Sequence, residues 1–152
     1  MELRHVRLDD PVAGPLLDGL ATEYLERYGS DDEVRLHHPA DEFLPPTGTF
    51  VVLLVDGELV AGGGVRPLDA VACEVKRMWT SAAHRRKGYA SVVLRELERW
   101  AAETGYAVVR LETGPLQPEA QAMYDRLGYR RIPVFGRYPT ALAFERSLTE
   151  RS

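Results

Sequence analysis

Cysteine and long apolar segments are scarce in this chain of 152 residues. Its single cysteine excludes an internal disulfide framework and any zinc site built from several cysteines. No apolar run reaches the ~18 residues that a membrane span needs. The first ten residues, MELRHVRLDD, lack the apolar segment of a secretory signal. We therefore expect a cytoplasmic protein with no membrane partner and no metal.

An excess of positive charge is also missing. Lys and Arg number 19 against 23 Asp and Glu, which gives a net charge of −4. A general nucleic-acid binder needs surplus cations to neutralise phosphates, so we expect no nucleic-acid partner unless the cations within residues 76–87 extend into a basic stripe. Hydrophobic residues make up 45% and charged residues 28%, and the length suits one globular domain over residues 1–152.

The spacing of apolar residues predicts a mixed α/β fold. Alternation or continuous β-rich runs predict strands, and a period near 3.6 predicts helices. The expected strands cover residues 2–8, 49–55, 58–66, 71–80, 106–113, 129–135 and 140–148, and the expected helices cover 11–28, 89–104 and a segment that begins at Pro118. The Asp56-Gly57 pair predicts an antiparallel hairpin. The strand–helix–strand segment 71–113 predicts a parallel, right-handed crossover.

The alternation breaks inside the strand expected at residues 71–80. Cys73 and Val75 share one face, but the next position on that face is Arg77. Either a β-bulge near residues 76–78 resets the pattern, or both faces of the strand are partly buried. The run of three glycines at residues 62–64 lacks the spacing of a phosphate loop and precedes no helix, so it indicates a strand bulge or a close backbone approach.

A basic turn at residues 85–88 stands directly before the expected helix 89–104. A helix N-terminus offers free backbone N–H groups and a partial positive charge, which together suit an anion. Gly88 permits close approach of the backbone, and no Ser, Thr, Asp or Asn immediately precedes the helix as a cap. The turn therefore predicts a phosphate site; the alternative is that these cations are only solvated loop charges.

These residues resemble a known family. Residues 85–90, RRKGYA, match the R/Q-x-x-G-x-G/A signature of the GNAT superfamily, the acetyl-CoA-dependent N-acetyltransferases, and resemble its small single-domain bacterial members. Residues 74–80 resemble the family's bulged fourth strand, and residues 111–129 its fifth strand and following helix. The likeness covers about residues 49–135, whereas the first 48 residues match only in the order of elements. It implies a mixed central sheet of about seven strands with helices on both faces.

The resemblance implies an acetyl-CoA site. Backbone N–H groups of residues 86–90 would bind the pyrophosphate, and backbone groups of Met78 and Thr80 would pair with the pantetheine arm. A free N–H near Met78 and Trp79 would hold the oxyanion. Gln117 stands where many relatives carry Asn, which makes it a weaker contact to the cofactor arm. The implied cofactor-binding residues are Met78, Trp79, Thr80, Arg85, Arg86, Lys87, Gly88, Tyr89, Ala90 and Gln117.

The resemblance also implies two catalytic residues. Tyr124 corresponds to the tyrosine that protonates the leaving thiolate in many members; alternatively it is a core tyrosine, because it lies on an apolar stripe. Glu74 is the first candidate for the base that takes the proton of the attacking amine, and Glu112 is the second. Alternatively Glu74 is a strand charge paired with Lys76 or Arg110.

The acceptor is expected to be a small-molecule amine or a peptide amine. Tyr24, Tyr28, Glu42 and Phe43 lie in the segment that lines the acceptor pocket in this family, and an acidic cluster in residues 31–42 would favour a cationic amine if it is not simply solvated. Relatives often dimerise, which leaves a homodimer open. The alternative function is that of a non-catalytic acyl-CoA sensor or regulatory module.

Two further residue types carry no predicted chemistry. Cys73 is expected to be a small, buried apolar residue, so we do not expect a reaction through a covalent acyl-cysteine intermediate. The adjacent His37 and His38 do not predict a metal site, because neighbouring side chains diverge and no carboxylate has the usual spacing.

Overall fold

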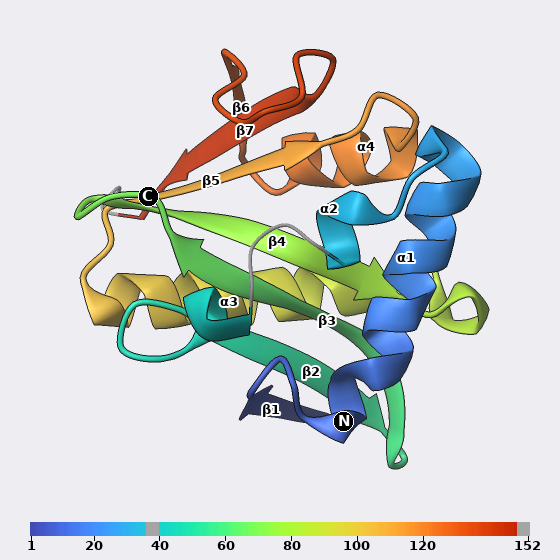
Figure 1. Cartoon of the computed structure of the whole chain (residues 1–152). Coiled ribbons are helices and arrows are strands. Elements are labelled where there is room, and N and C mark those ends of the chain that lie inside the picture. Colours follow the sequence, from blue (N-terminus) through green and yellow to red (C-terminus); the bar gives the residue numbers. More distant parts are fainter. Residues whose placement is uncertain (36–39, 149–152) are drawn as a thin grey trace.

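The computed structural model describes residues 1–35 and 40–148 (Figure 1). His37 and His38 lie outside this range. The helices are α1 (Gly14–Tyr28), α2 (Asp32–Arg35), α3 (Tyr89–Thr104) and α4 (Pro118–Arg126); the strands are β1 (Glu2–Val6), β2 (Thr49–Val55), β3 (Glu58–Pro67), β4 (Ala72–Thr80), β5 (Val108–Thr113), β6 (Arg130–Ile132) and β7 (Leu142–Ser147). Within the described ranges, no helix combines the length and apolarity needed to cross a membrane.

The strands form one seven-stranded mixed sheet in the order β1-β2-β3-β4-β5-β7-β6. Only β4 and β5 run parallel, joined across α3 as the crossover predicts, and every other neighbouring pair in this sheet is antiparallel. The hairpin between β2 and β3 turns at Asp56 and Gly57, which both adopt positive φ, at 52° and 79°. The predicted mixed sheet of about seven strands is confirmed.

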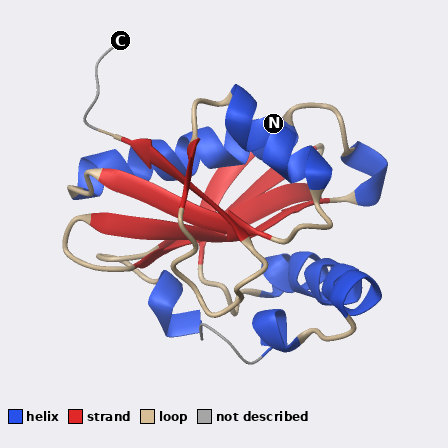
Figure 2. Cartoon of the chain, turned by 90° about the horizontal axis from the view of Figure 1, so that it is seen from above, coloured by secondary structure: helices blue, strands red, loops and turns tan. Residues whose placement is uncertain are grey.

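Helices cover both faces of the sheet (Figure 2). One core packs α3 and α4 against the sheet and includes Val51 and Leu53 of β2. The other packs α1 and the turn at Ala40–Phe43 against the opposite face and includes Phe50 and Val52. Because successive side chains of a strand point to opposite faces, a strand covered on both sides needs a continuous apolar run. This explains the TFVVLLV sequence of β2.

The predicted bulge in β4 is confirmed. Gly62 pairs with Trp79 and Gly64 with Lys76, so two residues of β4, Arg77 and Met78, stand opposite the single Gly63. Arg77 has a φ of 64°, outside the usual strand region.

The glycine run permits the close packing that the sequence suggests. A Cβ on Gly63 would overlap the Met78 sulfur, and a Cβ on Gly64 would lie 2.6 Å from Phe43 Cδ1. The rings of Phe43 and Phe50 therefore exclude a larger side chain at Gly64, whereas at Gly63 the Met78 side chain would have to shift.

Several element boundaries differ from the predicted ones. The helix expected from residue 11 begins at Gly14, because Asp10 accepts the Val12 N–H at 2.9 Å and caps a short 3-10 turn at Pro11–Ala13 instead. The strand expected at residues 129–135 ends at Ile132, before Pro133, which has no N–H to continue a ladder.

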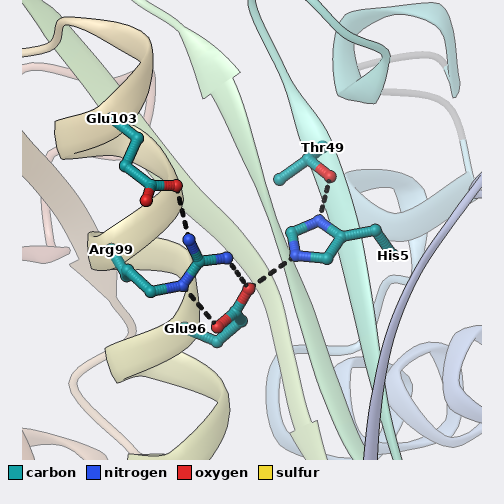
Figure 3. A network of polar contacts seen from close by, with 5 residues as sticks. All are labelled: His5, Thr49, Glu96, Arg99 and Glu103. Carbon is teal, nitrogen blue, oxygen red and sulfur yellow. Dashed lines mark hydrogen bonds and ion pairs between the residues drawn. The ribbon is translucent and has the colours of Figure 1, made fainter.

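A polar network fastens the edge strand β1 to α3 (Figure 3). His5 Nδ1 lies 2.8 Å from Thr49 Oγ1, and His5 Nε2 lies 2.6 Å from Glu96 Oε2. Glu96 also accepts hydrogen bonds from Arg99, which pairs in turn with Glu103. The hydrogen bonds from Arg99, and then that from His5, lower the pKa of Glu96 to about 2. Sequence reasoning did not find this network, since His5 and Glu96 are 91 positions apart.

Candidate active site

A cleft opens where β4 and β5 separate. The two strands pair from Ala72 opposite Val108 as far as Val75 opposite Leu111, and beyond that point β4 remains beside β3 while β5 remains beside β7. The bulge in β4 directly follows the last pair, and a bulged strand bends and twists away from its neighbour. The resulting cleft has a volume of about 700 Å³ and is lined by residues of α1, β4, the basic turn, α3, β5 and α4.

The basic turn presents backbone N–H groups to this cleft. Gly88 is the N-cap of α3 with a φ of 82°, and no side chain caps the helix. Within residues 1–35 and 40–148, the amides of residues 86–90 donate no hydrogen bond to backbone or side chain. Four of these residues line the cleft: Arg86, Gly88, Tyr89 and Ala90. Free amides at the positive end of a helix fit a diphosphate.

The side-chain charges of the turn contribute less directly. Arg85 forms an ion pair with Glu23 of α1. Arg86 is 87% exposed, and its Nη2 lies 3.6 Å from Glu119 Oε1 at the start of α4. Lys87 is exposed and lies outside the cleft lining. Two of the three cations, Arg85 and Arg86, thus line the cleft, and each is paired with a carboxylate.

Tyr124 is a core tyrosine that also lines the cleft. Its side chain is 5% exposed, and its ring packs against Tyr129 and Phe144 at centroid distances of 5.7 and 5.6 Å. The residue lines the cleft, and its hydroxyl makes no hydrogen bond in the described part of the chain. Burial raises the pKa of the Tyr124 phenol, which keeps it protonated at neutral pH.

Glu74 does not line the cleft. It is 4% exposed, and its two oxygens lie 2.8 Å from Arg66 Nη1 and 3.8 Å from Lys76 Nζ. Burial raises the pKa of Glu74, against the opposing effect of Lys76 and Arg66. The predicted pairing with Lys76 is present, whereas Arg110 pairs with Glu145 at 2.9 Å instead.

Glu112, the second candidate base, does line the cleft. It is the first residue of β5 beyond the last pair with β4. Its Oε2 accepts the backbone N–H groups of Phe135 and Gly136, both at 2.9 Å, and it forms no ion pair within the described residues. Glu112 thus places a carboxylate without a cationic partner at the point where the strands separate.

Of the four expected acceptor residues, only Tyr24 lines the cleft. Tyr24 lines the cleft, and burial raises the pKa of its phenol to about 12. Tyr28 lies just outside and donates a hydrogen bond to Gln117 Oε1 at 3.2 Å. Glu42 is ion-paired with Arg66, and Phe43 is fully buried against the sheet, so neither is on the cleft surface. The position of Glu42 and Phe43 in the chain suggested that they line a pocket, but Phe43 of the Ala40–Phe43 turn packs into the core.

Other predicted residues do reach the cleft. They are Met78, Trp79, Thr80, Arg85 and Gln117. Gln117 is held by the Gly114 N–H, which its Oε1 accepts at 2.9 Å. Of the acidic cluster, Glu33 pairs with Lys76 at 2.5 Å and is buried, and Asp31, Asp32 and Asp41 are absent from the lining.

Sequence reasoning missed several charged residues of the lining. Glu23 and Arg27 of α1 flank Tyr24, and Glu119 and Arg126 lie on α4 with Tyr124. Helical spacing offers the signal, because residues three or four positions apart share a face. The spacing does not show that these faces of α1 and α4 line the same cleft.

Comparisons with known proteins agree with this geometry. Residues 15–129 match the acetyltransferase (GNAT) family. The chain is 30% identical over 138 residues to the uncharacterized N-acetyltransferase YsnE of Bacillus subtilis, covering 88% of this chain and 91% of that protein.

Solved structures agree on the fold. A GNAT-family acetyltransferase from Staphylococcus aureus Mu50 superposes with a TM-score of 0.79 at 17% identity, covering 97% of this chain and all of the other. An aminoglycoside 6'-N-acetyltransferase complexed with coenzyme A superposes with a TM-score of 0.76 at 17% identity, covering 100% of this chain and 99% of that one. With its basic turn, split strands and cleft in the matched region, the chain belongs to the GNAT family of acetyltransferases.

Proposed function

We propose that this acetyltransferase moves the acetyl group of acetyl-CoA to the amine of a small molecule or a peptide. The observation that carries the proposal is the cleft itself, which brings the free amides of residues 86–90, the Tyr124 hydroxyl and the Glu112 carboxylate into one space. The thioester supplies an activated acetyl group with a thiolate as leaving group. The protein must therefore position it, donate one proton and accept another.

The cofactor would lie along the separated strands. Backbone N–H groups of residues 86–90 bind the pyrophosphate at the start of α3. On the side that faces β5, the backbone of β4 beyond Val75 has no strand partner among the described residues, so its groups near Met78 and Thr80 would pair with the pantetheine arm as a short strand would. A backbone N–H at the bulge then stabilises the oxyanion.

Tyr124 would be the general acid. Its hydroxyl has no competing partner in the described chain, so it is available to a leaving thiolate. Burial raises the pKa of the phenol, so proton transfer requires the hydroxyl to lie within hydrogen-bond reach of the sulfur.

Glu112 is the carboxylate that we propose for removal of the amine proton. Glu74, the first choice on sequence grounds, is buried, is paired with Arg66 and Lys76, and does not line the cleft. Glu112 lies on the cleft wall and is the first residue of β5 beyond its last pair with β4. Glu112→Gln should therefore reduce turnover more than Glu74→Gln does.

Membership of the family implies that the acceptor is an amine. Similar folds include enzymes named for aminoglycosides, which are polyamines, and the carboxylate of Glu112 suits an ammonium group. We further propose a cytoplasmic enzyme, with a homodimer as the state to test by light scattering.

Release of CoA thiol in the presence of a panel of amines tests this function. Turnover should require an amine, and Tyr124→Phe should lower kcat by roughly 10²–10⁴. Tyr106→Phe is the matched control, because the Tyr106 hydroxyl donates to Thr47 O at 2.7 Å, outside the cleft. If calorimetry shows tight acetyl-CoA binding but no amine supports turnover, the chain is an acyl-CoA sensor and the proposal is wrong.

A further inference from the structure

The end of α4 holds Tyr124 through Tyr129. The Tyr129 N–H donates to Tyr124 O at 3.0 Å, and the Gly128 N–H donates to Asp125 O at 3.2 Å, with Gly128 at a φ of 92°. These are the two hydrogen bonds of a Schellman motif, in which the residue after the glycine also packs on the residue five positions earlier. Here that contact joins the Tyr129 and Tyr124 rings. Tyr129 therefore holds both the carbonyl and the ring of Tyr124.

Tyr129 is itself anchored to α3. Its hydroxyl donates to Glu98 Oε2 at 2.6 Å, and Glu98 is 5% exposed. Glu98 Oε1 accepts from Arg95 at 2.6 Å and from Arg146 of β7 at 3.0 Å. Arg95 also donates to Leu127 O, at the C-cap of α4, at 3.1 Å. These hydrogen bonds link the C-terminal end of α4 to the middle of α3. We call the group formed by Glu98, Tyr129, Arg95 and Arg146 the clasp.

The direction of the Tyr124 hydroxyl depends on this clasp. In the described chain the hydroxyl makes no hydrogen bond, so the packing of the ring against Tyr129 and Phe144 sets the position of the hydroxyl oxygen. The clasp also connects the acid to the helix whose N-terminus carries the amides for the pyrophosphate. One helix would then determine the distance between the bound cofactor and the proton donor.

We propose that Glu98 and Tyr129 are positioning residues that aim Tyr124 at the leaving sulfur; this rests on the proposed function, in which Tyr124 is the acid. Neither residue lines the cleft. A positioning role predicts loss of kcat with unchanged cofactor affinity, because the amides of residues 86–90 are not altered.

The test is a double-mutant cycle. Tyr129→Phe keeps the ring and removes the bond to Glu98, and it should lower kcat about 10-fold with the KM for acetyl-CoA within twofold of wild type. In a Tyr124→Phe background the same change should cause no further loss, since the aimed hydroxyl is already absent. Tyr106→Phe, which removes another phenol hydrogen bond from the same core, should leave kcat unchanged.

Glu98→Gln provides the conservative comparison. Its carboxamide oxygen can still accept the Tyr129 hydroxyl, so kcat should remain above that of Tyr129→Phe even though the pairs with Arg95 and Arg146 are weakened. A crystal structure of Tyr129→Phe should show the Tyr124 ring displaced, a result that can be read whether or not the enzyme turns over.

Three results would overturn the positioning role. They are a wild-type kcat for Tyr129→Phe, an equal loss in the Tyr124→Phe background, and an unmoved Tyr124 ring in the variant structure. Absence of CoA release by the wild type with any amine is instead the failure of the proposed function, and it is seen before any variant is made.

Discussion

Neutralising Glu96 should destabilise the protein in a pH-dependent way. The carboxylate accepts hydrogen bonds from Arg99 and lies 2.6 Å from His5 Nε2, so it ties β1 to α3 (Figure 3). Its pKa of about 2 lies below the ordinary 4.5. A folded-state pKa below the unfolded value means that ionisation stabilises the fold above about pH 4.5, and that this stabilisation is lost as the pH falls from there toward 2.

The magnitude follows from the difference between 4.5 and about 2. At about 1.36 kcal/mol for each pKa unit, that difference corresponds to roughly 3.4 kcal/mol. Arg99 is half exposed, so water and salt screen much of the interaction, and we expect roughly 1–2 kcal/mol for Glu96→Gln at pH 7. The gap between variant and wild type should shrink by about half or more at pH 3, and should also shrink in high salt.

Urea unfolding of the two proteins at pH 7 and pH 3 measures that gap. The matched control is Glu103→Gln, which removes another carboxylate paired with Arg99 but one that is 67% exposed; it should change the free energy of unfolding by less than about 0.5 kcal/mol. A Glu96→Gln gap that is the same at both pH values, or no larger than that of Glu103→Gln, would refute the reasoning.

Three further outcomes are expected. Burial raises the pKa of Cys73 to about 12, so the thiol should not react with a disulfide reagent in the folded protein but should react fully after denaturation; rapid reaction of the native chain would contradict this. Gly64→Ala should destabilise by roughly 1–3 kcal/mol, because its Cβ would lie 2.6 Å from Phe43 Cδ1 and 2.7 Å from Phe50 Cδ2. A Cβ on Gly14 meets no described atom within 4 Å, so Gly14→Ala should not destabilise in this way; equal thermal melts of the two variants would be inconsistent with the packing. Ala90→Glu should weaken CoA binding at least 10-fold in calorimetry, since it places a negative charge at the cleft end of α3, while Lys87→Ala should change it less than threefold.

The fold could be predicted from local signals. The continuous apolar run of β2 and the Asp56-Gly57 turn are decided by residues near one another in the chain. The bulge in β4 could be predicted from the break in the alternation of apolar residues. The break arises at the bulge, where Arg77 adopts a positive φ. The free amides of the basic turn could be predicted as well, because they require only a glycine at the start of the helix and the lack of a capping side chain.

Which of the two candidate bases lines the cleft could not be predicted in this way. Glu74 and Glu112 both lie on strands near the expected site, and the distinction depends on where β4 and β5 stop pairing. Glu74 lies before that point and is enclosed by two cations, whereas Glu112 lies just beyond it, on the cleft wall.

The sequence by itself determined the order of elements, the faces that are apolar and the place of the basic turn directly before α3, since these depend on periodicity and on the backbone conformations that individual residues allow. Only the tertiary structure decided that Phe43 is buried in the core, that His5 meets Glu96, and that Glu98 clasps the end of α4 through Tyr129. The physical reason is that periodicity shows which side chains share a face, whereas the partner of that face is chosen by packing between segments far apart in the chain.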